Sequence, residues 1–158
     1  MTRWLIAAAT AGFITVAAAS IYAASNAPDG SWVPGSGSRG IILPRDAELA
    51  ATNGNALLVD VREPDEIQHG APLGANASFP FRLDGSRDED FVAEMVGVVR
   101  GKLDTKIIRL CATGVRSAAA RDLLLDHGFE NVKSLVGGFV AWQRDGLPIV
   151  AGRSQAGR

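Results

Sequence analysis

The stretch IIRLCATGVRSAAA, residues 107–120, contains the only cysteine of the 158-residue chain. A short apolar run at residues 107–110 leads into Cys111, and an alanine-rich segment follows. The apolar run is typical of a strand buried on both faces, and residues 117–127, closed by Gly128, predict a helix. Cys111 therefore stands where a strand ends, which is where ligands bind in parallel α/β sheets.

The loop after this cysteine has features that activate a thiol. A thiol reacts as its thiolate, and the ordinary pKa of a cysteine thiol is about 8.5. We expect the backbone N–H groups of residues 112–116 to point at the sulfur, and Arg116 adds a permanent positive charge. Gly114 permits a tight turn, Ala112 leaves the mouth of the loop open, and Ser117 is expected to cap the helix through its hydroxyl. The alternative is a buried core cysteine, since free cysteines are among the most buried residues. The spacing favours the nucleophile.

Strand and helix patterns alternate along the chain around this stretch. Apolar runs predict strands at residues 41–43, 56–61, 77–79, 107–110 and 132–136. Helical patterns occur at residues 44–50, 64–68, 88–99, 117–127 and 139–144. The alternation predicts an α/β fold with a central, mostly parallel sheet and helices on both of its faces.

Composition excludes several classes of function. The formal net charge is −1 and no basic stripe occurs, which argues against a nucleic-acid partner. A single cysteine cannot form an intramolecular disulfide or a multi-thiolate zinc site. The two histidines, His69 and His127, do not stand at metal-ligand spacing from Cys111, so we expect no metal.

Residues 1–24 predict either a signal peptide or a membrane anchor. Arg3 gives a positive head, and the uncharged residues 4–24 reach the roughly 20 residues that span a bilayer. Their many alanines and small-residue cleavage sites make a cleaved signal peptide as well supported as an uncleaved anchor. Both alternatives predict an extracytoplasmic (periplasmic) protein, either secreted or anchored to the inner membrane. Residues 25–40 predict a flexible linker, 41–150 the folded domain and 151–158 a polar tail.

Three motif blocks follow one another in the predicted domain. They are LLVDVREPDE at residues 57–66, CATGVRS at 111–117 and LVGGFVAW at 135–142, the last followed by GLP at 146–148. Together they resemble the rhodanese-like family, and in particular its single-domain exported thiosulfate sulfurtransferases. The resemblance implies the rhodanese-like α/β fold.

The resemblance also implies a sulfurtransferase with Cys111 as nucleophile. The thiolate would take a sulfane sulfur from a small anionic donor such as thiosulfate and form a covalent persulfide. The sulfur would then pass to cyanide, a thiol or a protein acceptor, with no cofactor beyond the persulfide. The implied substrate-binding loop consists of Ala112, Thr113, Gly114, Val115, Arg116 and Ser117. Arg116 would orient the donor, and Asp60 and Arg62 are expected to organise the loop region.

Two alternatives stay open beside this function. One is a rhodanese module that binds a partner or delivers sulfur to it, with little turnover of small molecules. The other is a cysteine phosphatase or arsenate-reductase-like enzyme, which is disfavoured because only four residues separate Cys111 from Arg116 and phosphatases use a longer loop.

Three positions depart from the expected pattern. Ala71 stands where the family usually has histidine. Ala112 stands where sulfurtransferases often have arginine or another polar residue, and this is expected to lower the affinity for thiosulfate. Arg109 falls in a strand expected to be buried, so it should pair with a carboxylate or reach solvent.

Overall fold

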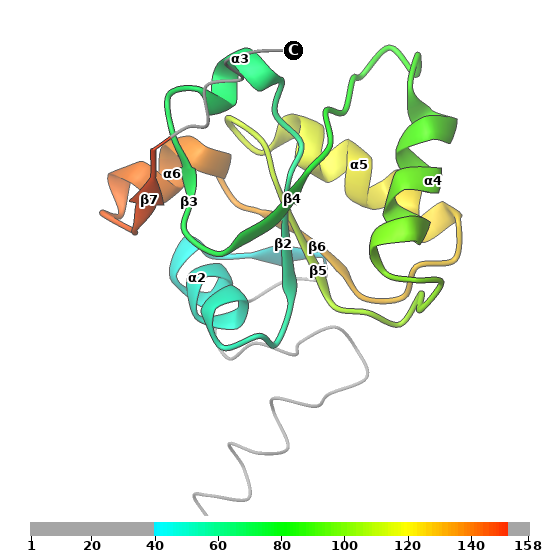
Figure 1. Ribbon diagram of the computed structural model, residues 1–158, viewed down its shortest axis with the longest axis horizontal. Helices are drawn as coiled ribbons and strands as arrows, with labels where there is room; N and C mark the ends of the chain where they lie inside the picture. The colour runs from blue at the N-terminus through cyan, green and yellow to red at the C-terminus, as the bar shows by residue number, and fades with distance from the viewer. Residues whose placement is uncertain (1–39, 152–158) are drawn as a thin grey trace, which may run out of the picture.

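The computed structural model describes residues 40–151, and its centre is a sheet of 5 parallel strands in the order β1-β6-β5-β2-β4 (Figure 1). The strands are Ile41–Ile42 (β1), Leu57–Asp60 (β2), Ala75–Ser78 (β4), Ile107–Leu110 (β5) and Val132–Leu135 (β6). Each neighbouring pair is parallel. The predicted parallel sheet is confirmed, and the predicted first strand lies at its edge.

Helices cover both faces of this sheet, as predicted (Figure 1). They are Pro44–Thr52 (α2), Pro64–Ile67 (α3), Asp88–Val98 (α4), Val115–Asp126 (α5) and Gly138–Arg144 (α6). Successive strand residues point to opposite faces, so the core divides in two. Ile108 and Leu110 pack with the residues of α2 and α6, whereas Ile107 packs with those of α4 and α5.

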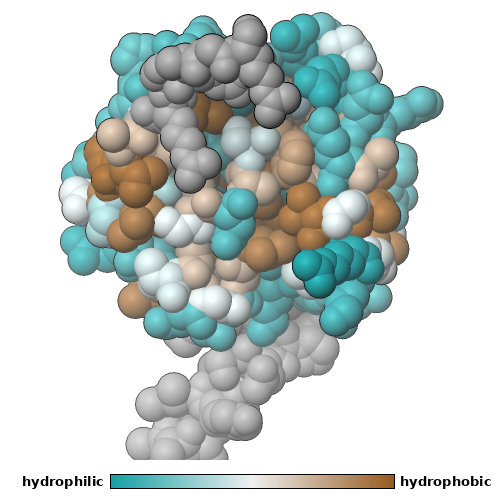
Figure 2. Space-filling view, viewed as in Figure 1, coloured by the Kyte–Doolittle hydropathy of each residue, from teal (hydrophilic) through white to brown (hydrophobic). Residues whose placement is uncertain are grey.

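Two short strands outside the main sheet were not predicted. Ala71–Pro72 (β3) pairs antiparallel with Ile149–Val150 (β7). Each has only 2 residues, and the two segments that pair lie far apart in the sequence, so no local pattern joins them. Leu73 also joins them, since its amide donates to the Pro148 carbonyl at 2.9 Å. Leu73, Ile149 and Val150 are exposed, and Figure 2 shows a hydrophobic patch where β7 lies in Figure 1.

The predicted signal or anchor at residues 1–24 lies outside the described residues. The same holds for the predicted linker up to residue 39 and for the predicted tail from residue 152. None of the helices within residues 40–151 has both the length and the hydrophobicity that a membrane-spanning helix requires.

Candidate active site

Cys111 directly follows β5 at the carboxyl edge of the sheet, and only 1% of its surface is exposed. Its sulfur accepts a hydrogen bond from the Gly114 amide at 3.1 Å and lies 3.6 Å from the Ser117 hydroxyl. Gly114 has a φ of 102°, a conformation that residues with a Cβ rarely adopt. This turn curls the loop around the sulfur and starts α5, so the sequence correctly placed the thiol between a strand and a helix.

The N-terminus of α6 holds the loop from the other side. The Phe139 amide donates to the Cys111 carbonyl at 2.7 Å, and the Val140 amide donates to the Ala112 carbonyl at 3.0 Å. Gly138 lies so close to these carbonyls that a Cβ at its position would clash with them, and its φ of 57° is also left-handed. The Gly-Gly pair of the third motif block therefore fixes the loop of the second block, because only glycine allows this approach.

Hydrogen bonds stabilise the thiolate form of Cys111. Burial alone raises the pKa of the thiol, because it removes the charged form from water. Hydrogen bonds from the amides of Ser117, Gly114 and Thr113 and from the Ser117 hydroxyl outweigh burial, so the pKa of Cys111 falls below its ordinary value. The loop thus favours the nucleophilic form of a thiol that is nevertheless well covered.

The predicted capping role of Ser117 is wrong. The left-handed turn at Gly114 lets α5 begin at Val115, two residues earlier than predicted, with Gly114 as the N-cap and no capping side chain. The Ser117 hydroxyl instead contacts the Gly114 carbonyl at 3.1 Å and the hydroxyl of Ser134 on β6 at 2.8 Å. Ser134, which the sequence did not single out, thereby helps to orient the hydroxyl that faces the Cys111 sulfur.

Arg116 forms a bidentate ion pair with Glu66 on α3. Its two terminal nitrogens lie 2.7 and 2.6 Å from the two carboxylate oxygens. Hydrogen bonding to Arg116 is the main cause that lowers the pKa of Glu66. The guanidinium that the sequence predicted to orient an anionic donor is therefore already engaged, and no pattern could pair residues 50 positions apart.

Asp60 and Arg62 form a buried ion pair behind the loop. The Arg62 guanidinium donates to Asp60 at 2.7 Å and to the Gly70 carbonyl at 2.8 Å. It also stacks on the ring of Phe139, with its central carbon 3.9 Å from the ring centroid. Since the amide of Phe139 holds the Cys111 carbonyl, this pair supports the loop through α6 and makes no contact with the sulfur itself.

Arg109 neither pairs with a carboxylate nor reaches solvent, so both expected alternatives are wrong. It is fully buried, and its three side-chain nitrogens make no hydrogen bond with the described residues. Its guanidinium stacks on the Phe91 ring of α4, 4.2 Å from the ring centroid. Burial lowers the pKa of Arg109 to about 9. The aromatic face of Phe91 provides the favourable contact that a carboxylate or solvent was expected to provide.

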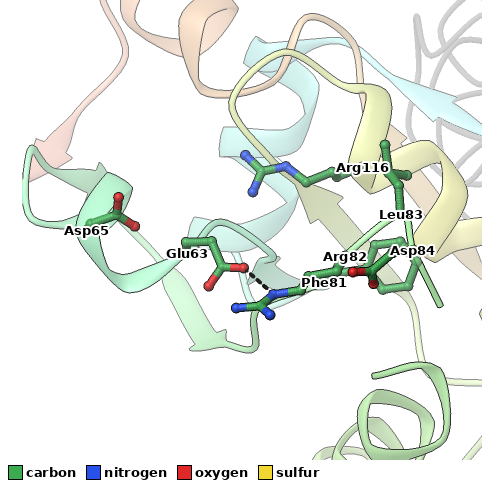
Figure 3. Close-up of a pocket in the computed structure, with 7 residues that line it drawn as sticks. All are labelled: Glu63, Asp65, Phe81, Arg82, Leu83, Asp84 and Arg116. Carbon is green, nitrogen blue, oxygen red and sulfur yellow. Dashed lines mark hydrogen bonds and ion pairs between the residues drawn. The ribbon is translucent and has the colours of Figure 1, made fainter. Parts of the chain in front are cut away.

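An open pocket of about 610 Å³ adjoins Arg116 (Figure 3). Its lining residues are Glu63, Asp65, Phe81, Arg82, Leu83, Asp84 and Arg116. Arg116 belongs to the loop that follows Cys111, so the pocket adjoins that loop. Among the predicted loop residues, Thr113 and Val115 are exposed and Ala112 is half-buried. Within residues 40–151, no cluster of three or more His, Cys, Asp or Glu side chains could hold a metal ion.

Comparison with known proteins agrees with this geometry. The model of the rhodanese-like domain matches residues 43–145. The chain belongs to the rhodanese-like family. This rhodanese-like chain is 39% identical over 97 residues to "Thiosulfate sulfurtransferase 16, chloroplastic" of Arabidopsis thaliana, covering 59% of this chain and 78% of the relative. It is 34% identical over 111 residues to the thiosulfate sulfurtransferase GlpE of Glaesserella parasuis serovar 5, covering 70% and 93%.

A solved structure of a family member shows the same fold. The solution structure of the rhodanese-like domain of an Anabaena protein superposes with a TM-score of 0.59 at 25% identity, over 77% of this chain and 88% of that one. The rhodanese-like fold predicted from the three motif blocks is thereby confirmed.

Proposed function

We propose that this rhodanese-like protein is a sulfurtransferase that carries sulfane sulfur as a persulfide on Cys111. The observation that supports the proposal best is the thiol at the end of β5, hydrogen-bonded to the Gly114 amide at 3.1 Å inside a curled loop. The relatives named thiosulfate sulfurtransferase add to it.

The proposed reaction has two half-reactions, each a displacement at sulfur. The Cys111 thiolate attacks the outer sulfur of thiosulfate, the S–S bond of the donor breaks, and sulfite leaves with the electron pair. An acceptor such as cyanide or a thiolate then attacks the outer sulfur of the persulfide. The bond to Cys111 breaks and its electron pair returns to the cysteine as thiolate. Ping-pong kinetics are expected, because the enzyme holds the sulfur between the two steps.

The loop around Cys111 suits this chemistry on both sides of the reaction. The amides of Gly114, Thr113 and Ser117 stabilise the starting thiolate. The same groups are positioned to receive the negative charge of a terminal persulfide sulfur, as preorganised donors do in other enzymes. No metal or cofactor takes part in either step of the proposed reaction.

A sulfur-delivery module with little small-molecule turnover is the second candidate. It is favoured by the 1% exposure of Cys111 and by the Glu66 carboxylate that already occupies Arg116. The same ion pair counts against a cysteine phosphatase, because a phosphate would need the guanidinium that Glu66 holds.

Thiocyanate formation from thiosulfate and cyanide tests the proposal. The wild-type protein is expected to turn over, and Cys111→Ser is expected to be inactive. The delivery module predicts that a persulfide forms on Cys111 in one turnover while steady-state turnover stays very low. Equal rates in the wild type and Cys111→Ser, with no persulfide formed on the wild type, would refute both candidates.

We also propose that the protein acts outside the cytoplasm, either secreted or held at the inner membrane by residues 4–24. Support comes from the uncharged N-terminal run behind Arg3. N-terminal sequencing of the mature protein separates the alternatives, since a start at residue 1 or 2 indicates an anchor and a start after the uncharged run a cleaved signal. A protein recovered from the cytoplasmic fraction with its N-terminus intact would contradict both.

A further inference from the structure

Two buried hydroxyl groups lie behind the Cys111 sulfur, one after the other. The Ser117 hydroxyl, on the first turn of α5, lies 3.6 Å from the sulfur. The Ser134 hydroxyl, on β6, lies 2.8 Å from the Ser117 oxygen. All three residues are buried, so the hydrogen-bond partners of these groups come from the fold rather than from bulk water.

The charge of the sulfur decides where the Ser117 proton can point. A hydroxyl donates one hydrogen bond and can accept others. When Cys111 is a thiol, its S–H can donate to the Ser117 oxygen, and the Ser117 hydroxyl can donate to the Gly114 carbonyl at 3.1 Å. A thiolate can only accept, so the Ser117 hydroxyl then has to turn its proton toward the sulfur.

The fold permits this turn of the hydroxyl without leaving a buried group unpaired. The Gly114 carbonyl keeps a hydrogen bond from the Ala118 amide at 3.1 Å. Between the two hydroxyl oxygens either one can be the donor, so Ser134 can donate to Ser117 once the Ser117 proton points at the sulfur. A hydrogen bond that a hydroxyl accepts strengthens the one that it donates. Ser134 can therefore reinforce the hydrogen bond from Ser117 to the thiolate.

The sheet holds Ser134 in the position from which it donates. Strand β6 lies between β1 and β5, and α5 packs against it. The Ser134 amide donates to the Gly40 carbonyl at 2.9 Å. The backbone of Ser134 is thus fixed by strands on both sides, and its short side chain reaches the Ser117 hydroxyl from a rigid element.

We propose that Ser134 is a positioning residue that directs the Ser117 proton to the Cys111 sulfur whenever this sulfur is negatively charged. The inference rests on the proposed function and adds a residue that acts in both half-reactions. In the resting enzyme the two hydroxyl groups stabilise the thiolate, and the hydrogen bond of the Ser117 hydroxyl is among the causes that lower the pKa of Cys111.

The same pair of hydroxyl groups acts again when the persulfide is discharged. The inner sulfur of the persulfide is neutral and accepts only a weak hydrogen bond. As the acceptor attacks the outer sulfur, the S–S bond breaks and the electron pair returns to Cys111, so the inner sulfur becomes charged. Both protons stay on their hydroxyl groups, and only their directions change. The hydrogen bond from Ser117 is stronger in this transition state than in the persulfide, so it lowers the barrier.

Two measurements on the full chain test the role of Ser134. The pH dependence of alkylation by iodoacetamide reports the pKa of Cys111. The rate at which cyanide discharges the preformed persulfide, followed as thiocyanate in a single turnover, reports the second half-reaction. Ser134→Ala removes the hydroxyl and alters no charge. Arg116, whose charge interacts with the thiol, is the same in every variant.

Ser134→Ala is expected to raise the pKa of Cys111, and to slow both alkylation at pH 7 and discharge by cyanide roughly threefold. The double substitution with Ser117→Ala separates positioning from general support of the fold. Because Ser134 acts through the Ser117 hydroxyl, Ser134→Ala should change neither rate when Ser117 is already alanine. A merely structural role would slow the reactions by the same factor in both backgrounds.

Ser134→Thr and Ser134→Val form a matched pair, because their side chains have nearly the same shape and only threonine has a hydroxyl. The added methyl group affects the packing of both, so Ser134→Thr should react about threefold faster than Ser134→Val in both assays. This pair decides the question if Ser134→Ala is too unstable to assay.

The outcomes distinguish the inference from the proposed function. If either rate is unchanged in Ser134→Ala, if the slowing is the same with and without the Ser117 hydroxyl, or if Ser134→Thr and Ser134→Val react equally fast, the inference is overturned and the proposed function stands. If no persulfide forms on the folded protein, the proposed function falls and the inference falls with it.

Discussion

Replacing the buried guanidinium of Arg109 should make the protein more stable. This side chain is fully buried, and its nitrogens make no hydrogen bond with any described residue. Burial lowers its pKa from the ordinary arginine range to about 9, which corresponds to a penalty of about 5 kcal/mol for keeping the charge in the core at pH 7. Stacking on Phe91 at 4.2 Å returns about 2 kcal/mol of this penalty.

Arg109→Met removes the charge and keeps an unbranched side chain that fills most of the same space. After about 1 kcal/mol is allowed for the smaller volume, the substitution should raise the free energy of unfolding by about 2 kcal/mol at pH 7. Urea unfolding of the wild type and the variant at pH 7 measures this difference. A loss of more than about 1 kcal/mol would refute the reasoning, since it would mean that the guanidinium has a strong partner in the fold.

Two further measurements test the cause of this effect. Phe91→Leu should cost about 1–2 kcal/mol more in the wild type than in Arg109→Met, because only the wild type has a cation on the ring. The pH dependence of the stability difference between the two proteins is an independent check. Since the folded pKa of Arg109, about 9, lies below the ordinary arginine pKa of the unfolded chain, the unfolded chain binds more protons once the pH exceeds about 9. The advantage of Arg109→Met should therefore shrink as the pH rises above about 9.

Three other substitutions have defined outcomes. Ser117→Ala should raise the pKa of Cys111 and slow its alkylation by iodoacetamide at pH 7, because it removes a hydroxyl that lowers this pKa. An unchanged pH dependence of the alkylation rate would contradict this role of the hydroxyl. Gly138→Ala should lower the free energy of unfolding, measured in urea, by about 3 kcal/mol, because its Cβ clashes with the loop and its φ is left-handed. The control Gly146→Ala has a φ of 66° with open space around it and should lower this free energy by only about 1 kcal/mol. Equal losses would show that the close approach at Gly138 is unimportant. Glu66→Gln should lower the free energy of unfolding by about 1 kcal/mol at pH 7. Because the folded pKa of Glu66 is lowered, the group contributes stability only while it is ionised, and the difference between the two proteins should close as the pH falls below 4.5. A difference that does not depend on pH would mean that the charge of Glu66 does not matter.

The sequence predicted the features that depend on local pattern. The strands that became β2 and β5 are continuous apolar runs, and such runs are typical of strands with helices on both sides. Cys111 was identified because a lone thiol, a glycine and an arginine occur together at a strand end. The three motif blocks indicated the family for the same reason, since each block is a short contiguous run of residues.

The features that the sequence missed depend on contacts between distant segments. The ion pair of Arg116 with Glu66 joins positions 50 residues apart, so no local pattern could report it. Arg109 was expected to pair with a carboxylate or reach solvent, whereas the fold offers the face of Phe91, which lies on a helix that the sequence could not place against it. The start of α5 at Val115 was missed because the tight turn expected at Gly114 was not recognised as the N-cap of the helix.

The most direct test of the central claim is the intact mass of the protein after brief incubation with thiosulfate and removal of the excess. The account predicts a mass increase of one sulfur atom in the wild type, its absence in Cys111→Ser, and its loss from the wild type on addition of a thiol acceptor. A folded wild-type protein that acquires no sulfur from thiosulfate or any other sulfane donor would contradict the claim that Cys111 carries sulfur as a persulfide.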